Sequence, residues 1–290
     1  MIDAGGTVMT RADNPQQRLF RNSTTGASVF DANQFEYDWT GGFEVGARYK
    51  IDRCRTLELR YFQINDIDAQ GVFFVPTAED LIVENTGQDL IGNLGGDMAG
   101  AVSASTDVLS FESNLRRRQN EVTDLFFGFR FAQIRDEFNT FIDVPAIPFT
   151  NDITFDADNH LYGLQIGAES VLYDNSSRGV RLDSILKGGV YINDIDVDMV
   201  NIQSGALFGN ASDSATSFAS LLEANLGATW QLTPNISFRC GYQSTLFTGV
   251  ALATEQLSGN SSVFNPATVN ADDDEVLFLH GATFNLRLRL

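Results

Sequence analysis

The chain has 290 residues, of which 43% are hydrophobic, and it carries a formal net charge of −19. A chain this acidic repels nucleic-acid phosphates, so we expect no nucleic-acid partner. It contains no run of about 18 consecutive apolar residues, which excludes a transmembrane helix. Membrane-crossing β-strands stay open as an interpretation, because such strands need only about ten residues and expose just every second one to lipid.

Apolar and polar residues alternate with a period of two in ten segments, as expected for strands whose two faces differ. In chain order these segments lie near residues 3–11, 41–50, 55–65, 109–116, 125–133, 162–169, 181–192, 222–230, 236–243 and 284–290. The alternation is imperfect, since Phe62, Phe126 and Ile185 fall on the polar face. Local bulges or apolar contacts on that face would accommodate them.

The connections between these segments alternate in length. Long connections are expected near 12–36, 66–103, 134–157, 194–215 and 250–274. Short ones are expected at 51–54, 119–120, 174–177 and 233–235, where Asn, Asp, Ser and Pro favour turns. This alternation places every long connection at one end of a sheet, which is the plan of an outer-membrane barrel. A Greek-key sandwich has no reason to follow it.

We therefore predict an all-β fold, with residues 1–290 forming a single domain. The expected architecture is a closed antiparallel up-and-down transmembrane β-barrel of about ten strands, with long loops at one end. A soluble secreted β-sandwich stays open as an alternative, because its core and solvent faces would give the same alternation.

Charge decides which face meets lipid in a barrel, because Arg or Lys facing lipid at mid-bilayer costs about 2–4 kcal/mol. We therefore expect the charged face to line the lumen. The expected lumen residues are Glu44, Arg48, Glu58, Arg60, Arg130, Lys187, Glu223, Arg239, Arg287 and Arg289. The expected lipid-facing aromatic residues are Trp39, Phe43, Tyr49, Phe127, Phe129, Trp230 and Phe284. Trp39 and Tyr49 bracket a run that would span about 23 Å of the membrane normal, close to an apolar band about 25 Å tall.

The sequence gives little sign of chemistry. Its two histidines, His160 and His280, have no Ser or Cys nucleophile motif nearby, so we expect no catalytic residues and no enzyme. Asp194, Asp196 and Asp198, and the run 272–275, could offer oxygen ligands to Ca²⁺, but a solvated acidic loop is the favoured interpretation. We expect no metal and no cofactor. Cys54 and Cys240 are expected to be unpaired thiols.

Several segments then resemble the β-barrel porin-seven family of bacterial outer-membrane proteins. The matching segments are 54–62, 128–131, 159–167, 187–193, 223–251 and 279–281. The resemblance covers most of the chain in order. It implies a location in the bacterial outer membrane, contact with outer-membrane lipid, and insertion by the barrel assembly machinery. It implies no catalytic residue, no established substrate and no particular oligomeric state.

Met1 is followed directly by Ile2-Asp3-Ala4-Gly5-Gly6, without the basic and apolar regions of a signal peptide. Because an outer-membrane protein needs one, we expect this chain to start downstream of the true N-terminus. Two functions follow from the barrel hypothesis. One is a narrow porin-like channel for small solutes, since ten strands enclose a lumen that side chains largely fill. The other is a non-conducting structural or adhesive surface barrel with acidic extracellular loops.

Overall fold

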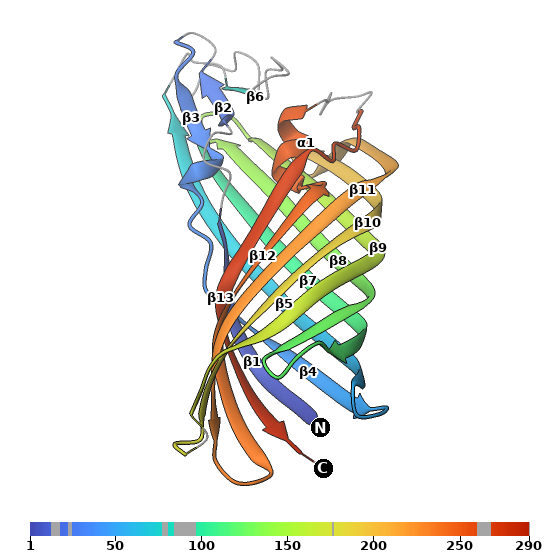
Figure 1. Ribbon diagram of the computed structural model, residues 1–290. Helices are drawn as coiled ribbons and strands as arrows, with labels where there is room; N and C mark the ends of the chain where they lie inside the picture. The colour runs from blue at the N-terminus through green and yellow to red at the C-terminus, as the bar shows by residue number, and fades with distance from the viewer. Residues whose placement is uncertain are drawn as a thin grey trace.

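The computed structural model describes residues 1–12, 18–22, 25–76, 81–83, 97–175, 177–259 and 268–289. Ten antiparallel strands close into one hydrogen-bonded ring in the order β1-β13-β12-β11-β10-β9-β8-β7-β5-β4, and β4 pairs back to β1 (Figure 1). The prediction of a closed barrel of about ten strands is therefore confirmed. The β-sandwich alternative is wrong, because the ten strands form one ring and not two stacked sheets.

Eight of the ten barrel strands are longer than a membrane crossing requires, and β1 and β4, with 11 residues each, are just long enough. Their bounds are β1 Ile2–Ala12, β4 Thr40–Lys50, β5 Arg55–Val75, β7 Met98–Arg118, β8 Thr123–Val144, β9 Phe149–Asn175, β10 Val180–Gln203, β11 Ala206–Gln231, β12 Ile236–Val250 and β13 Glu275–Leu288. The 27 residues of β9, at about 3.3 Å each and a tilt of roughly 45°, cover about 63 Å of the barrel axis. This is more than twice the height of an apolar membrane band of about 25 Å.

The four connections expected to be short, which join β4 to β5, β7 to β8, β9 to β10 and β11 to β12, lie with both chain termini at one end of the barrel, at the bottom of Figure 1. In outer-membrane barrels this end faces the periplasm. The β4–β5 turn illustrates how such a connection is held. The Asp52 carboxylate accepts hydrogen bonds from the backbone N–H groups of Cys54 and Arg55, each at 2.8 Å, and from the Arg55 guanidinium. The Cys54 N–H and the Arg55 side chain lower the pKa of Asp52 below its ordinary value.

Two of the five expected long connections are wrong. Residues 134–157 form the upper part of the β8–β9 hairpin, and residues 194–215 form that of the β10–β11 hairpin, so each pair of strands joins in a tight turn. Ser204 and Gly205 make the second turn with positive φ angles of 48° and 80°. The expected connection 66–103 is likewise strand at both ends, within β5 and β7. Parts of the expected connections 12–36, 66–103 and 250–274 lie outside the described residues.

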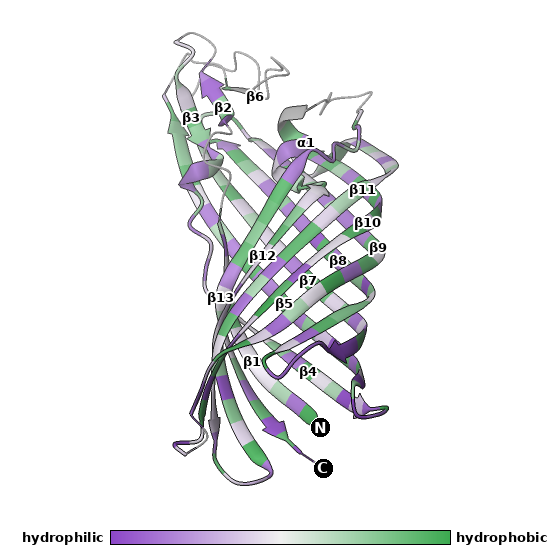
Figure 2. Ribbon diagram, in the orientation of Figure 1, coloured by the Kyte–Doolittle hydropathy of each residue, from purple (hydrophilic) through white to green (hydrophobic). Residues whose placement is uncertain are grey.

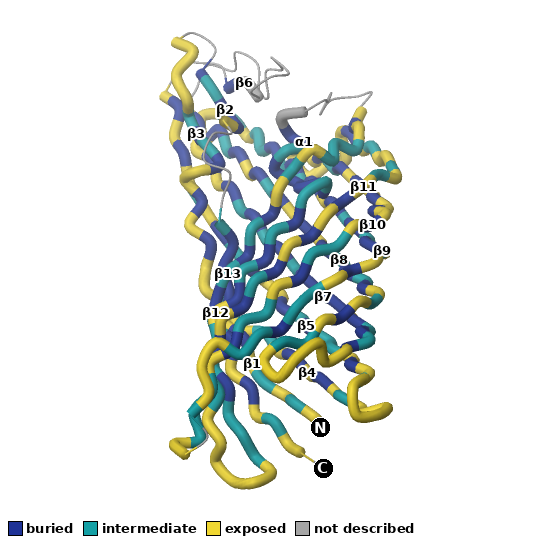
Figure 3. The backbone as a smooth tube through the Cα atoms, viewed as in Figure 1, coloured by how far each residue is buried: buried dark blue, intermediate teal, exposed yellow. Residues whose placement is uncertain are grey.

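The two faces of each long strand exchange character partway along the barrel. In β9 the outward residues of the lower part are apolar and those of the upper part are polar, whereas the inward residues follow the opposite order. The outward series, from the upper end down, is Asp152, Thr154, Asp156, Asp158, His160, Tyr162, Leu164, Ile166 and Ala168. The inward series is Ile153, Phe155, Ala157, Asn159, Leu161, Gly163, Gln165, Gly167 and Glu169. Figures 2 and 3 show the underlying alternation of hydropathy and burial along the strands.

This exchange divides the barrel into two zones. In the lower zone apolar residues point outward, as lipid requires, and charges point inward. In the upper zone the interior is apolar and the outer wall is polar, as in a water-soluble barrel. The upper zone therefore projects above the membrane as an extracellular extension. Ten residues of β9 above Tyr162, at the same rise and tilt, would project about 23 Å.

The described parts of the connections at the upper end of the barrel include folded elements (Figure 1). A three-stranded sheet of β2 (Arg18–Asn22), β3 (Ser28–Asp31) and β6 (Leu81–Val83) lies there, with a short 3-10 helix at Ala32–Gln34. The helix α1 (Ala253–Gly259) lies beside it. Leu19, Phe20, Phe30 and Leu257 are all buried in one apolar core with the inward residues of the upper zone. Among the described residues, no helix is long and apolar enough to cross a bilayer.

Candidate functional site: the barrel lumen

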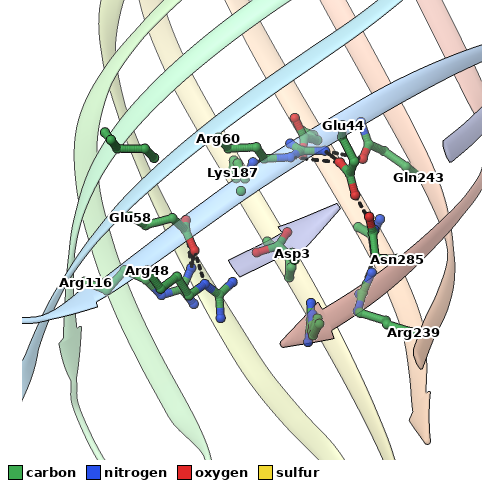
Figure 4. A pocket seen from close by; sticks show the side chains of 16 residues that line it. Asp3, Glu44, Arg48, Glu58, Arg60, Arg116, Lys187, Arg239, Gln243 and Asn285 are labelled. Carbon is green, nitrogen blue, oxygen red and sulfur yellow. Dashed lines mark hydrogen bonds and ion pairs between the residues drawn. The ribbon is translucent and has the colours of Figure 1, made fainter. Parts of the chain in front are cut away.

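The charged residues of the lower zone converge inside the ring. Of the ten expected lumen residues, Glu44, Glu58, Arg130, Lys187, Glu223 and Arg239 are buried, and Arg48, Arg60 and Arg287 are half-buried. Arg289 follows the end of β13 and is exposed at the periplasmic rim. Figure 4 shows side chains from several strands pointing toward one another across the lumen.

Three cations and three carboxylates form the central cluster. Arg60 contacts Glu44 at 2.6 Å, Glu223 at 2.9 Å and Glu112 at 3.1 Å. Lys187 contacts Glu112 at 2.9 Å and Glu223 at 3.0 Å. Arg130 lies 2.9 Å from Glu223. Because these six groups come from six strands, their ion pairs tie opposite walls of the barrel together. Because the cluster holds as many cations as carboxylates, the attraction between opposite charges offsets the free-energy cost of removing each charge from water.

A second cluster lies nearer the periplasm. Arg116 pairs with Glu58 at 2.9 Å and also contacts Glu169 directly, and Arg48 bridges the same two carboxylates. Arg181 reaches Glu169 at 3.3 Å. Glu169 therefore holds three guanidinium groups.

A separate pair joins Arg239 to Asp183 at 2.7 Å. The Arg239 guanidinium lies across Gly227, where a Cβ atom would collide with it. An inward-facing glycine here makes room for a long cation in a narrow barrel.

Sequence reasoning missed some members of these clusters. Simple alternation places four further charged residues on the polar face, and this signal was enough to include them: Glu112, Arg116, Glu169 and Asp183.

The structure also accounts for the three apolar residues that were predicted to lie on the polar face. Phe62 and Phe126 are buried, and Phe126 lies under the Arg116 guanidinium at 4.8 Å, while Ile185 lines the same cavity as the central cluster. No bulge is needed at Phe62 or Phe126, which are registered regularly with their neighbours.

Little free space remains between the two clusters. The cavity lined by Glu44, Arg60, Lys187, Arg239 and Arg287 has a volume of about 50 Å³. A water molecule needs about 10–15 Å³ of such volume, so the cavity accommodates only a few waters. Ion pairs thus close the lumen at the level of the membrane.

A second barrier lies above the ion pairs. Val250, Ala251, Leu252 and Ala253 enter the lumen from the β12 end and are at most 3% exposed. Asn159 holds this segment through two hydrogen bonds, because its side chain donates to the Ala251 carbonyl and accepts from the Ala251 N–H, both at 2.8 Å. We call residues 250–257 the plug.

Asp136 secures the start of α1 within the plug. Its carboxylate accepts a hydrogen bond from the Ala253 N–H at 2.8 Å and pairs with Arg11 at 2.6 Å. Arg11 also lies over the Tyr37 ring, 4.7 Å from its centroid. The upper zone is therefore closed by apolar packing and by a small number of buried polar clamps.

The expected lipid-facing aromatic residues lie on the outer surface. Trp39, Phe43, Tyr49, Phe127, Phe129, Trp230 and Phe284 are all exposed on the barrel wall. His280 also points outward, and its Nδ1 lies 2.7 Å from the Tyr242 hydroxyl. Trp39 meets the His280 ring edge-on at 5.6 Å between centroids. These amphipathic rings suit the boundary between lipid and water.

Carboxylates cover the outer wall of the upper zone. Asp194, Asp196 and Asp198 lie on β10 and not on a loop, so their assignment to a loop is wrong. Asp107, Glu137, Asp156 and Asp158 line a groove of about 390 Å³ together with Asp198 and Arg135. Partial desolvation, together with the carboxylates of Glu137, Asp198 and Asp158, raises the pKa of Asp156. This surface faces the extracellular medium.

The other residues considered for metal binding or chemistry lie away from the central cluster. Asp272, Asp273 and Asp274 place their carboxylates within 4.8 Å of one another on the connection before β13. The two cysteines are free, with Cys54 exposed in the β4–β5 turn and Cys240 half-buried in β12. His160 points outward from the middle of β9.

Comparisons with solved structures return membrane barrels of low similarity. The Escherichia coli outer membrane protease OmpT is 8% identical, with a TM-score of 0.48 and coverage of 100% of this chain and 96% of that one. The Pseudomonas putida toluene transporter TodX is 8% identical, with a TM-score of 0.26 and coverage of 99% and 88%. An anion-selective porin from Comamonas acidovorans is 8% identical, with a TM-score of 0.20 and coverage of 99% and 99%. The fold assignment rests on the closed ring of strands and not on these likenesses.

No curated protein matches the chain. A family model does match it, over residues 22–289, and its description is "Putative beta barrel porin-7". The match includes nine of the ten barrel strands and every ion pair described above except Arg11–Asp136, because Arg11 precedes the matched residues. The chain therefore belongs to this family of β-barrel proteins of the bacterial outer membrane.

Proposed function

We propose that the protein is a non-conducting outer-membrane barrel and that its extracellular end carries its function. The observation that carries the proposal is the double closure of the lumen. The central ion cluster occupies the membrane level and the plug occupies the upper zone. A solute crossing the barrel would have to displace both, and a buried charge left without its partner costs about 3–5 kcal/mol.

The upper zone supports a surface role. Its strands continue well above the apolar band, and its outer wall carries carboxylates from β7, β8, β9 and β10. A rigid, acidic projection of this kind repels anionic surfaces and attracts cationic ones. The proposal assigns no catalytic role to His160 or His280, since both side chains point away from the lumen.

A narrow channel for small solutes is the second candidate. The family description favours it, and so does the open space at the periplasmic end of the lumen, where cavities of about 350 and 780 Å³ lie below the ion clusters. In this candidate the central cluster and the plug would both have to move before a solute could pass.

Single-channel recording in planar lipid bilayers separates the two candidates. Purified wild-type protein, shown to be folded by its shifted mobility in unboiled gel samples, is expected to give no conductance steps. A general porin added afterwards to the same bilayer is the positive control. Reproducible steps from the folded wild-type barrel would contradict a closed lumen and favour the channel.

A further inference from the structure

The periplasmic end of the lumen holds a cavity that the proposed function does not use. Its volume is about 350 Å³, and residues of β4, β9, β10, β11, β12 and β13 line it. Four arginines contribute to the lining, whereas the acidic groups there are two. The arginines are Arg48, Arg181, Arg287 and Arg289, and the acids are Glu169 and Asp174.

The cations outnumber the acceptors that remain free to hold them. Glu169 already contacts Arg48, Arg116 and Arg181. The neighbouring cavity of about 780 Å³ shares Arg48 and Arg289 and adds Lys50, Arg53 and Arg118, with Asp124 as its acid. The periplasmic mouth of the barrel is therefore basic, although the whole chain carries a net charge of −19.

Arg287 is the unusual member of this group. It lines both this cavity and the small cavity of the central cluster. Its Nε atom is buried without a hydrogen-bond partner, and its guanidinium makes no ion pair or hydrogen bond with any residue that the structure describes. The nearby charges of Arg48 and Arg239 repel it, and the carboxylates of Glu169 and Asp183 attract it from beyond ion-pair distance. The Nε atom of Arg181 is also buried and without a partner.

Unused guanidinium donors facing a cavity are suited to an oxyanion. The guanidinium group presents five N–H donors in a planar fork that matches carboxylate and phosphate oxygens in pairs. A polyvalent anion seated between Arg287 and Arg181 would satisfy buried donors and reduce the repulsion among the arginines. At about 10–15 Å³ for each water, a volume of about 350 Å³ accommodates more than about twenty waters, which is enough for a pyrophosphate or a sugar phosphate.

We propose that this cavity is a periplasmic binding site for a small polyvalent oxyanion of the phosphate class, with Arg287 and Arg181 as its principal ligands. The site opens toward the periplasm and is closed above by the ion clusters. It therefore takes its ligand from the periplasm and does not require passage through the barrel. The inference does not depend on whether the lumen conducts.

Isothermal titration calorimetry of the full barrel in detergent micelles tests the site, with pyrophosphate as the probe and ionic strength held constant. Wild-type protein is expected to bind about one pyrophosphate per barrel. Arg287→Gln is expected to weaken binding at least tenfold, because a charge-assisted, paired contact is lost. This variant is expected to fold, because the Arg287 guanidinium makes no ion pair or hydrogen bond with any residue that the structure describes. Arg181→Gln offers a second test at the same site.

Arg178→Gln is the matched control, since Arg178 is exposed in the β9–β10 turn at the same end of the barrel and does not line the cavity. It is expected to bind pyrophosphate like the wild type. Three results would overturn the site: no binding by the wild type, unchanged binding by Arg287→Gln and Arg181→Gln, or equal weakening by Arg178→Gln. Equal weakening would mean that the anion responds only to the overall charge of this end.

Discussion

Leu226→Arg is expected to destabilise the barrel by about 2–4 kcal/mol, whereas Ser214→Arg on the same strand is expected to change its stability by less than about 0.5 kcal/mol. Both side chains point outward from β11 and both are exposed. Leu226 lies in the middle of the apolar band, where an arginine must be withdrawn from water. Ser214 lies six outward positions higher, opposite Asp196 in the extracellular zone.

The measurement is urea unfolding of the two variants and the wild type in lipid vesicles, followed by tryptophan fluorescence. A water-soluble barrel would tolerate arginine at both exposed positions. Equal and small effects at the two sites would therefore contradict a lipid-facing band at Leu226. A large effect at Ser214 would place the boundary of the membrane higher on β11 than the change of polarity indicates.

Replacing a carboxylate of the central cluster is expected to destabilise the barrel as much as Leu226→Arg does, or more. Glu112 and Glu223 have side chains that are 1% and 2% exposed, and together they hold Arg60, Arg130 and Lys187. Glu112→Gln or Glu223→Gln alone is expected to cost about 3–5 kcal/mol, because each leaves buried cations with too few partners.

The double variant is expected to lose more stability than the two single variants lose in sum. Each single change relieves the repulsion between the two carboxylates, and that relief is available only once. Adding Lys187→Met to Glu112→Gln removes one cation as well, and is expected to recover part of the lost stability. Glu121→Gln in the exposed β7–β8 turn is the control and is expected to be neutral. Urea unfolding in vesicles measures all of these variants. Near-neutral single variants would mean that water, and not the opposing charges, solvates the central cations.

The lower zone of the barrel could be predicted from sequence because lipid imposes a simple rule on it. Every strand there keeps apolar residues on the outside, so the alternation of Leu222, Leu226 and Trp230 with Glu223 and Asn225 identifies both the strand and its orientation. Positions of charged residues on the inner face follow from parity alone.

The upper zone escaped prediction because the same alternation continues there with its phase reversed. In β8, Phe127, Phe129 and Phe131 point outward, but beyond them Ile134 and Phe138 point inward. A search for strands with apolar outer faces therefore ends near residue 133 and assigns the rest to a loop. The strand continues because its apolar residues now pack against the plug and the small sheet.

The pairing inside the lumen also lies beyond sequence reasoning. Arg60 and Glu223 are 163 residues apart, and only the register and stagger of all the intervening strands bring them together. Parity indicates that both face inward, but not that they meet. The same is true of Asn159, which holds a plug that is 92 residues away in the chain.

The central claim is that the outward apolar band lies in lipid, and the two native tryptophans test it without any substitution. Trp39 stands just before β4 at the upper edge of the band, and Trp230 lies near the end of β11 at the lower edge, with exposed fractions of 58% and 37%. Their fluorescence is measured in vesicles that contain brominated lipids. Bromine near the headgroup is expected to quench both strongly, bromine at the end of the acyl chain less, and aqueous iodide weakly. Emission unaffected by either lipid but fully quenched by iodide would contradict the claim.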